Sequence, residues 1–492
     1  MQRQLVRSPR TLVIVCAIAG CSGTITQEST PDEGDDESPT DEGSGGRGGT
    51  NAAGNGGGRP PGPTTPESAG PRPLRRLTRD EYDHTIRDLL GDDSRPARAF
   101  PVDVRGKGGF VDPLAVSGVE TMRYRDAAEA IATRAIGNLA KLAPCSGTTR
   151  AAEETCAKSF ITTFGKRAFR RPLSPEDETA LFGVYRAVRA APLADDHRQA
   201  IGVVLTAMLQ APQFLYHWET PTDRARARNG LVALDDYEVA SRLSYFLWSS
   251  MPDDALFAAA DAGKLTEVAE IERHARRMLR DGRASDTVDS FFAQLLDVDH
   301  LEDLVKDTRA YPSFDAALAR SMAAETAAFT RWAVLEDGHL PTLLTSSVSF
   351  VDARLAKLYG ASGVTSSTPE KVTLDPGQRF GILTQGTFLA VQANTYETSP
   401  ILRGKLILER LLCETVPPPP ADVDTNIPPA RPGEQTREKY EEHEKSPACA
   451  ECHKLMDPLG FAFESYDGIG AWRTTDAGRP VRTDGVAVLP SG

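Results

Sequence analysis

Apolar side chains recur at helical spacing through most of the chain after residue 73. Thr78 and Glu81 have the spacing of a capping box, in which each side chain satisfies a backbone N–H group at the start of a helix. The helix would end at Gly91, because glycine adopts the left-handed conformation that closes many helices. Between them lies an apolar stripe of Tyr82, Ile86 and Leu89.

The same signals recur downstream. Ser174 is a candidate cap, Pro175 suits the first helical position, and two acidic residues face the positive end of the helix dipole. Three further apolar faces are predicted, formed by Leu181, Val184 and Tyr185, by Val239, Leu243, Phe246 and Leu247, and by Phe314, Leu318, Met322 and Phe329. No Gly-rich phosphate loop follows a β-rich run, which argues against a nucleotide-binding sheet. The predicted fold is therefore mainly α.

The first 20 residues follow a different pattern, with three arginines, an uncharged apolar run and then Cys21. They have the form of a secretory signal peptide, and the run is about half the roughly 20 residues of a membrane-spanning helix. Residues 18–21 resemble a bacterial lipobox, so we expect Cys21 to be lipidated. The alternative is an ordinary signal peptide with an incidental cysteine. Ser22 resembles the pattern of lipoproteins sent to the outer membrane.

The rest of the chain divides by composition. Residues 21–72 contain almost no large apolar side chains, so we predict a disordered tether held by the lipid anchor. Residues 73–225 are predicted to form N-terminal helical modules, and residues 226–362 a central helical module. Residues 363–492 are predicted to form a C-terminal module, in which a Pro-rich break separates the helical body from a small cysteine-containing segment.

Two cysteines, Cys145 and Cys156, lie close together in the chain. An exported protein meets oxidising conditions, so we predict a disulfide between them. The alternative is a pair of buried free thiols.

The sequence from Cys449 to His453 reads Cys-Ala-Glu-Cys-His. Two thiols three residues apart can reach the two vinyl groups of haem, and the adjacent imidazole is directed at the iron. Zinc is one alternative, but it needs four ligands and no second Cys or His pair lies nearby. A thioredoxin-like redox pair lacks its βαβ setting. We therefore predict covalent haem c on Cys449 and Cys452, with His453 as the axial iron ligand.

The sixth ligand of the iron is less constrained. Met456 lies three residues after His453, so on a helix its sulfur belongs to the same side of the haem. We interpret Asp457-Pro458 as the turn that ends this helix, and the Pro458 carbonyl as a candidate partner for the second imidazole nitrogen. The candidates for the sixth ligand are Met322, His339 and His443, or a residue beyond the end of this chain.

No catalytic residues are assigned. His217, His300 and His339 are interpreted as packing or surface residues, and two acidic pairs at 235–236 and 253–254 as helix caps. The formal net charge of -13 argues against nucleic acid as a partner.

Several stretches together resemble the large envelope proteins of planctomycetes and myxobacteria, which are assembled from consecutive domains of unknown function and often associated with cytochrome c modules. The resemblance covers residues 73–492 and rests on residues 76–82, 169–173, 242–248, 355–360, 399–405, 449–453, 456–461 and 466–473. Members of this family usually continue into another helical module, so the chain resembles a truncated member, and the missing part would have held a disulfide partner for Cys413.

Three functions agree with these features. The first is electron transfer by a tethered haem in the cell envelope, with an unidentified redox partner. The second is a haem-dependent oxidoreductase or peroxidase-like enzyme with a substrate pocket in the helical body. The third is a surface binding or assembly module with a structural haem. In each case we expect an exported lipoprotein of the outer membrane, on its periplasmic or cell-surface face.

Overall fold

The computed structural model describes residues 74–106, 109–111, 118–145, 149–190, 196–219, 227–228, 231–416, 431–443 and 447–487. The described chain is mainly helical, as predicted, and its strands form only two-stranded antiparallel sheets. The predicted signal peptide, the lipidation site Cys21 and the tether all lie outside these residues. None of the described helices combines the length and hydrophobicity needed to cross a membrane.

The first helix begins and ends as its sequence predicts. The Thr78 hydroxyl accepts a hydrogen bond from the Glu81 backbone N–H at 3.1 Å, and the Glu81 carboxylate accepts one from the Thr78 N–H at 2.8 Å. Gly91 closes the helix with φ of 69°. Tyr82 and Ile86 are buried in the first hydrophobic core. This core is built mainly by α1 (Arg79–Leu90), η1 (Pro96–Ala99), α2 (Gly118–Ile136), α3 (Leu139–Leu142), α4 (Arg150–Phe169), α5 (Pro175–Ala190), α6 (His197–Gln210) and α7 (Pro212–Leu215).

A second, smaller core lies around Trp248, whose indole N–H donates to the carbonyl of Met278 at 2.9 Å. The acidic pairs at residues 235–236 and 253–254 cap two of its helices, as predicted, because Asp235 and Asp253 accept from backbone N–H groups. The elements of this part are β1 (Ala227–Arg228), β2 (Leu231–Val232), α8 (Asp236–Trp248), α9 (Asp254–Asp261), α10 (Val268–Met278) and α11 (Ala284–Leu295).

One residue of a predicted apolar face in this core is exposed. Val239, Leu243 and Leu247 pack against the core as predicted, but Phe246 is 74 % exposed. Helix α8 also buries Tyr245 and Trp248. Their polar atoms have partners inside the protein, so both large rings can be buried without leaving a polar group unsatisfied.

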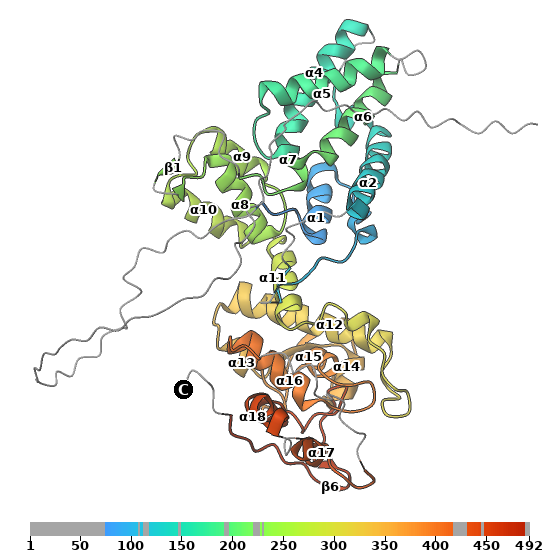
Figure 1. Cartoon of the computed structure of the whole chain (residues 1–492), viewed down its shortest axis with the longest axis vertical. Helices are drawn as coiled ribbons and strands as arrows, with labels where there is room; N and C mark the ends of the chain where they lie inside the picture. The colour runs from blue at the N-terminus through green and yellow to red at the C-terminus, as the bar shows by residue number, and fades with distance from the viewer. Residues whose placement is uncertain are drawn as a thin grey trace, which may run out of the picture. The chain divides into compact units, whose positions relative to one another are not determined.

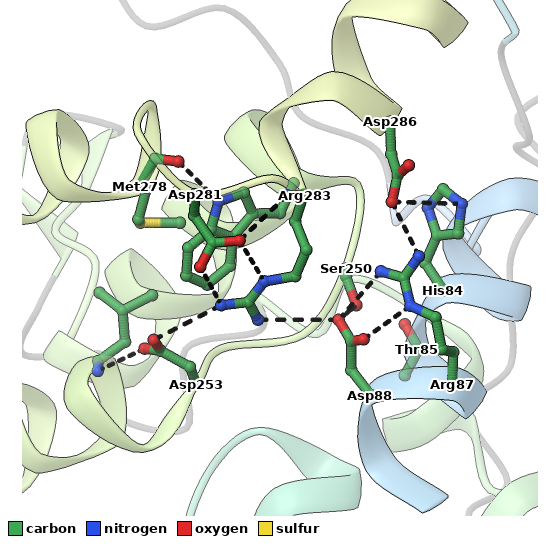
Figure 2. Close-up of polar contacts among 12 residues, drawn as sticks. His84, Thr85, Arg87, Asp88, Ser250, Asp253, Met278, Asp281, Arg283 and Asp286 are labelled. Carbon is green, nitrogen blue, oxygen red and sulfur yellow. Dashed lines mark hydrogen bonds and ion pairs between the residues drawn. The ribbon is translucent and has the colours of Figure 1, made fainter. Parts of the chain in front are cut away.

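A charged network joins α1 to the helices around Trp248 (Figure 2). Arg87 donates to Asp286 of α11 at 2.8 Å, and the Ser250 hydroxyl donates to Asp88 at 2.7 Å. The Arg283 guanidinium stacks on the Trp248 ring, 3.5 Å from its centroid. These contacts are partly buried, so solvent screens them less than it screens surface ion pairs.

The third core contains Met322, Phe329, Phe388 and Leu389. In Figure 1 its helices are coloured from yellow to red, in sequence order. Its elements are η3 (Leu301–Asp303), α12 (Ala316–Arg331), η4 (Trp332–Asp337), α13 (Thr342–Thr345), β3 (Val348–Val351), α14 (Ala353–Tyr359), β4 (Glu370–Thr373), η5 (Ile382–Thr384), α15 (Gly386–Val391), α16 (Pro400–Leu406) and η6 (Ile407–Leu411). The last elements are α17 (Thr436–His443), α18 (Pro447–Phe461), β5 (Thr475–Asp476) and β6 (Arg479–Pro480).

Candidate functional site

The predicted haem residues lie on α18, which packs directly against α16 (Figure 1). A Cβ atom at Gly404 of α16 would lie 1.8 Å from the Met456 carbonyl oxygen, and one at Gly460 of α18 would lie 1.9 Å from the Pro400 carbonyl oxygen. Only glycine fits at these two positions, because the backbones of the helices touch there. The contact fixes the position of α18 without relying on flexible side chains.

The predicted end of this helix is wrong. We expected a turn at Asp457-Pro458, but α18 continues through Pro458 to Phe461. A proline inside a helix removes one N–H group and normally bends or ends it. Here the backbone contacts of Met456 and Gly460 with α16 hold the helix on both sides of the proline.

The attachment residues follow one another on this helix. Cys449 and Cys452 are separated by about one helical turn, and His453 comes directly after Cys452. Cys452 is a partly buried free thiol, whereas the side chain of Cys449 lies outside the described part of the structure. The His453 side chain is 12 % exposed.

The imidazole of His453 is held by a carboxylate. Its Nδ1 lies 2.9 Å from Oδ2 of Asp457, which is fully buried one turn further along α18. The sequence predicts the Pro458 carbonyl as the partner of this imidazole, and the structure replaces it with Asp457. Continuation of the helix explains the change, because residues four apart on a helix face each other.

This donor set fits a c-type haem. Two cysteines lie about one turn apart, and the neighbouring imidazole already has a hydrogen-bond partner on Nδ1, so Nε2 is the nitrogen that would bind iron. A hydrogen-bonded second nitrogen is the usual arrangement for histidine ligands of metals.

The candidates for the sixth ligand lie in different surroundings. Met322 is fully buried in the third core beside Gly386. The His339 side chain is 79 % exposed, and the side chain of His443 lies outside the described part. Met456 is buried on α18 itself, on the same helix as His453, as expected.

A buried arginine supports the segment that follows α18. Arg403 of α16 is fully buried and donates to the carbonyls of Phe463, Tyr466, Asp467 and Leu389. Glu464 lies 3.7 Å from Arg403 and 2.7 Å from Arg473. Burial raises the pKa of Glu464, although both guanidinium groups act in the opposite direction. The role of Arg403 could not be predicted from the sequence, because its partners are backbone carbonyls, which carry no sequence signal.

A second buried carboxylate lies in the third core. Glu325 accepts hydrogen bonds of 2.6 Å from Ser349 and from Tyr359. The Arg379 guanidinium stacks on Tyr359, 3.6 Å from the ring centroid. Burial raises the pKa of Glu325 to about 7, despite these lowering influences. The sequence analysis missed this group because Glu325 lies among small residues with no recognisable motif.

The helical body contains a cavity of about 650 Å³ beside His217. Phe110 and Phe291 stack at its rim with ring centroids 5.4 Å apart, and Phe246 adds a third exposed ring. At its floor, His217 Nε2 lies 3.1 Å from the Glu81 carboxylate. Burial opposes ionisation of Glu81, but the charges of His217 and Arg75 lower its pKa to about 2.

The structure also shows the surroundings of the other residues that the sequence singled out. Cys145 and Cys156 are joined by a disulfide, with Cα atoms 5.7 Å apart. His300 lies near Asp297 and Asp299, and Arg105 forms ion pairs with both carboxylates. Cys413 is an exposed free thiol.

Four family models match the chain one after another. They are PSD3, a protein of unknown function (DUF1587), at residues 75–137; PSD5 (DUF1595) at 156–219; PSD4 (DUF1592) at 234–361; and PSCyt3 (DUF1588) at 379–476. The PSCyt3 match contains the segment from Cys449 to His453. No curated protein and no solved structure matches the chain.

Proposed function

We propose a haem-dependent function for this chain, which belongs to the planctomycete-type family assembled from the four consecutive domains DUF1587, DUF1595, DUF1592 and DUF1588. It is an exported lipoprotein that carries one covalent c-type haem and transfers electrons in the cell envelope. The observation that carries the proposal is the pairing of His453 with buried Asp457 on the helix that also bears Cys449 and Cys452.

Each residue has a defined part in the proposal. The thiols of Cys449 and Cys452 hold the haem through two thioether bonds, and Nε2 of His453 binds the iron. Bound haem supplies a one-electron Fe(III)/Fe(II) couple. Asp457 keeps the proton of His453 on Nδ1, and the contact of Gly404 with the Met456 backbone keeps α18 in place while the charge on the iron changes.

Export and anchoring complete the proposal. Attachment of haem c takes place outside the cytoplasm, which agrees with the signal peptide expected at residues 1–20 and with lipidation at Cys21. The lipid would hold the protein at the outer membrane within reach of envelope redox partners. The name PSCyt3 of the matching family model agrees with a cytochrome-like segment.

The test is an optically monitored redox titration of the full chain, exported by a host that matures c-type cytochromes. We expect one reversible one-electron transition and no spectral change of the native reduced protein under carbon monoxide. The matched control is Cys413→Ser, which removes a free thiol outside the attachment segment and should leave the titration unchanged. A protein without a c-type spectrum would overturn the proposal.

A second candidate function is favoured by the cavity beside His217, which offers an aromatic rim and a charged floor to a small molecule. In this case the chain is a haem-dependent oxidoreductase, and the iron keeps an open position. Binding of carbon monoxide by the native reduced protein would favour this candidate over electron transfer.

A further inference from the structure

Asp457 is an isolated buried carboxylate. Its side chain is fully buried, and His453 provides its one side-chain hydrogen bond among the residues that the structure describes. Its second oxygen, Oδ1, has no hydrogen-bond partner in that part of the chain. A buried carboxylate with a single donor among the described residues depends strongly on that donor.

The contact also determines the chemistry of the imidazole. A carboxylate that accepts the Nδ1 proton fixes the tautomer with Nε2 as the metal-binding atom. It also draws the proton away from the ring, which makes Nε2 a stronger electron donor. A stronger donor stabilises Fe(III) relative to Fe(II), and hydrogen bonding to an axial ligand is one of the means by which a protein sets a haem potential.

The surroundings keep the pair from separating. Asp457 lies between Met456 and Pro458, on the part of α18 that touches the backbone of α16. Tyr440 of α17 is also buried, and it interacts electrostatically with Asp457. The close backbone contact holds α18 against α16, and the Asp457 side chain is fully buried beside His453.

We propose that Asp457 is a positioning residue that lowers the reduction potential of the haem through His453. The inference rests on the proposed function, since it requires haem at Cys449 and Cys452. The inference goes further than that function, because it assigns a direction: Asp457 shifts the Fe(III)/Fe(II) couple towards Fe(III). A haem of this kind suits a redox partner of low potential.

The test compares Asp457→Asn with the wild-type protein, each carrying its haem, by the midpoint of the redox titration. Asparagine keeps the shape, and its amide oxygen can still accept a hydrogen bond from Nδ1–H, but it removes the charge. We expect the Fe(III)/Fe(II) equilibrium to shift at least tenfold towards Fe(II), which equals about 59 mV for one electron. The control is Asp484→Asn, which removes a charge at a side chain that is 72 % exposed and should leave the midpoint unchanged.

A second measurement needs no variant and covers a failure of Asp457→Asn to mature. In the reduced wild-type protein, a low-spin Fe(II) haem is diamagnetic, so the Nδ1 proton of His453 can be followed by NMR. A slowly exchanging, strongly deshielded proton supports the proposal, and a rapidly exchanging one contradicts it. Haem attachment with an unchanged Asp457→Asn midpoint overturns this inference alone, whereas absence of haem from the wild-type protein overturns the proposed function as well.

Discussion

At the scale of single residues, three buried carboxylates after residue 320 differ in their partners. Glu464 pairs with two guanidinium groups, Asp457 is hydrogen-bonded to the imidazole of His453, and Glu325 accepts from two neutral hydroxyl groups. The difference in partners has a consequence for Glu325. Without a direct ion pair, burial dominates and raises its pKa to about 7 from the ordinary 4.5.

This rise predicts a pH dependence of stability. A carboxyl group whose pKa is higher in the folded state stabilises the fold fully below pH 4.5, and this contribution is lost as the pH rises to about 7. The difference between the two pKa values corresponds to a loss of about 3 kcal/mol at most in the free energy of unfolding. Urea unfolding followed by tryptophan fluorescence at both ends of this range should show the loss.

Glu325→Gln is the matched variant, since it cannot ionise and keeps an oxygen for Ser349 and Tyr359. Its unfolding free energy should change less between the two pH values than that of the wild-type protein. Equal changes in both proteins would assign the pH dependence to other groups.

At the scale of elements, the sequence predicts features with local partners better than features that depend on contacts with other helices. The capping box of Thr78 and Glu81 is confirmed because both partners lie in one local segment. Only Phe246 of the predicted α8 face is wrong, because the helix buries the neighbouring Tyr245, which depends on a partner from another helix, Thr85. The end of α18 was wrong because its contact with α16 outweighs Pro458. That error also hid Asp457 as the partner of His453, whose spacing of four residues becomes meaningful only on a continuous helix.

The contact between α16 and α18 predicts that Gly404→Ala is strongly destabilising. The added methyl group would overlap the Met456 carbonyl, and no side-chain rotation can relieve a backbone clash. Gly183→Ala on α5 is the control, because a Cβ atom there meets nothing within 4 Å and should stabilise the helix by about 0.5–1 kcal/mol. In urea unfolding, the free energy of unfolding should fall for Gly404→Ala and rise for Gly183→Ala. An unchanged free energy for Gly404→Ala would contradict the packing described.

The disulfide between Cys145 and Cys156 predicts a linked pair in a non-reducing peptide map of the exported protein. It should stabilise the first core by roughly 3 kcal/mol, because it closes a short loop in the unfolded chain. The double variant Cys145→Ser and Cys156→Ser should therefore lower the unfolding free energy. Recovery of both residues as free thiols from exported protein would disprove the link.

At the scale of the whole molecule, four family models follow one another through the described chain. The residues proposed to hold haem lie within the PSCyt3 match, whereas the cavity beside His217 lies in the helical body. Mainly helical architecture could be predicted from periodicity alone. The cavity could not, because its rim combines Phe110, Phe246 and Phe291, which are far apart in the sequence.

Anchoring is predicted to depend on Cys21. Cys21→Ser should move the protein from the membrane fraction to the soluble periplasm or leave it unprocessed, because the acceptor of the lipid is lost. Cell fractionation followed by immunoblotting measures this, with Cys413→Ser as the control that keeps the membrane fraction. Unchanged partition and processing of Cys21→Ser would rule out lipidation at this residue.

Covalent haem on α18 is tested most directly by mass spectrometry of the protein exported from a host with c-type maturation. The wild-type protein should exceed its polypeptide mass by one haem, and the added mass should lie on the peptide that contains Cys449 and Cys452. Cys413→Ser should retain the haem, and the double variant Cys449→Ser and Cys452→Ser should lose it. Unmodified Cys449 and Cys452 in the wild-type protein, or haem retained by the double variant, would contradict the account.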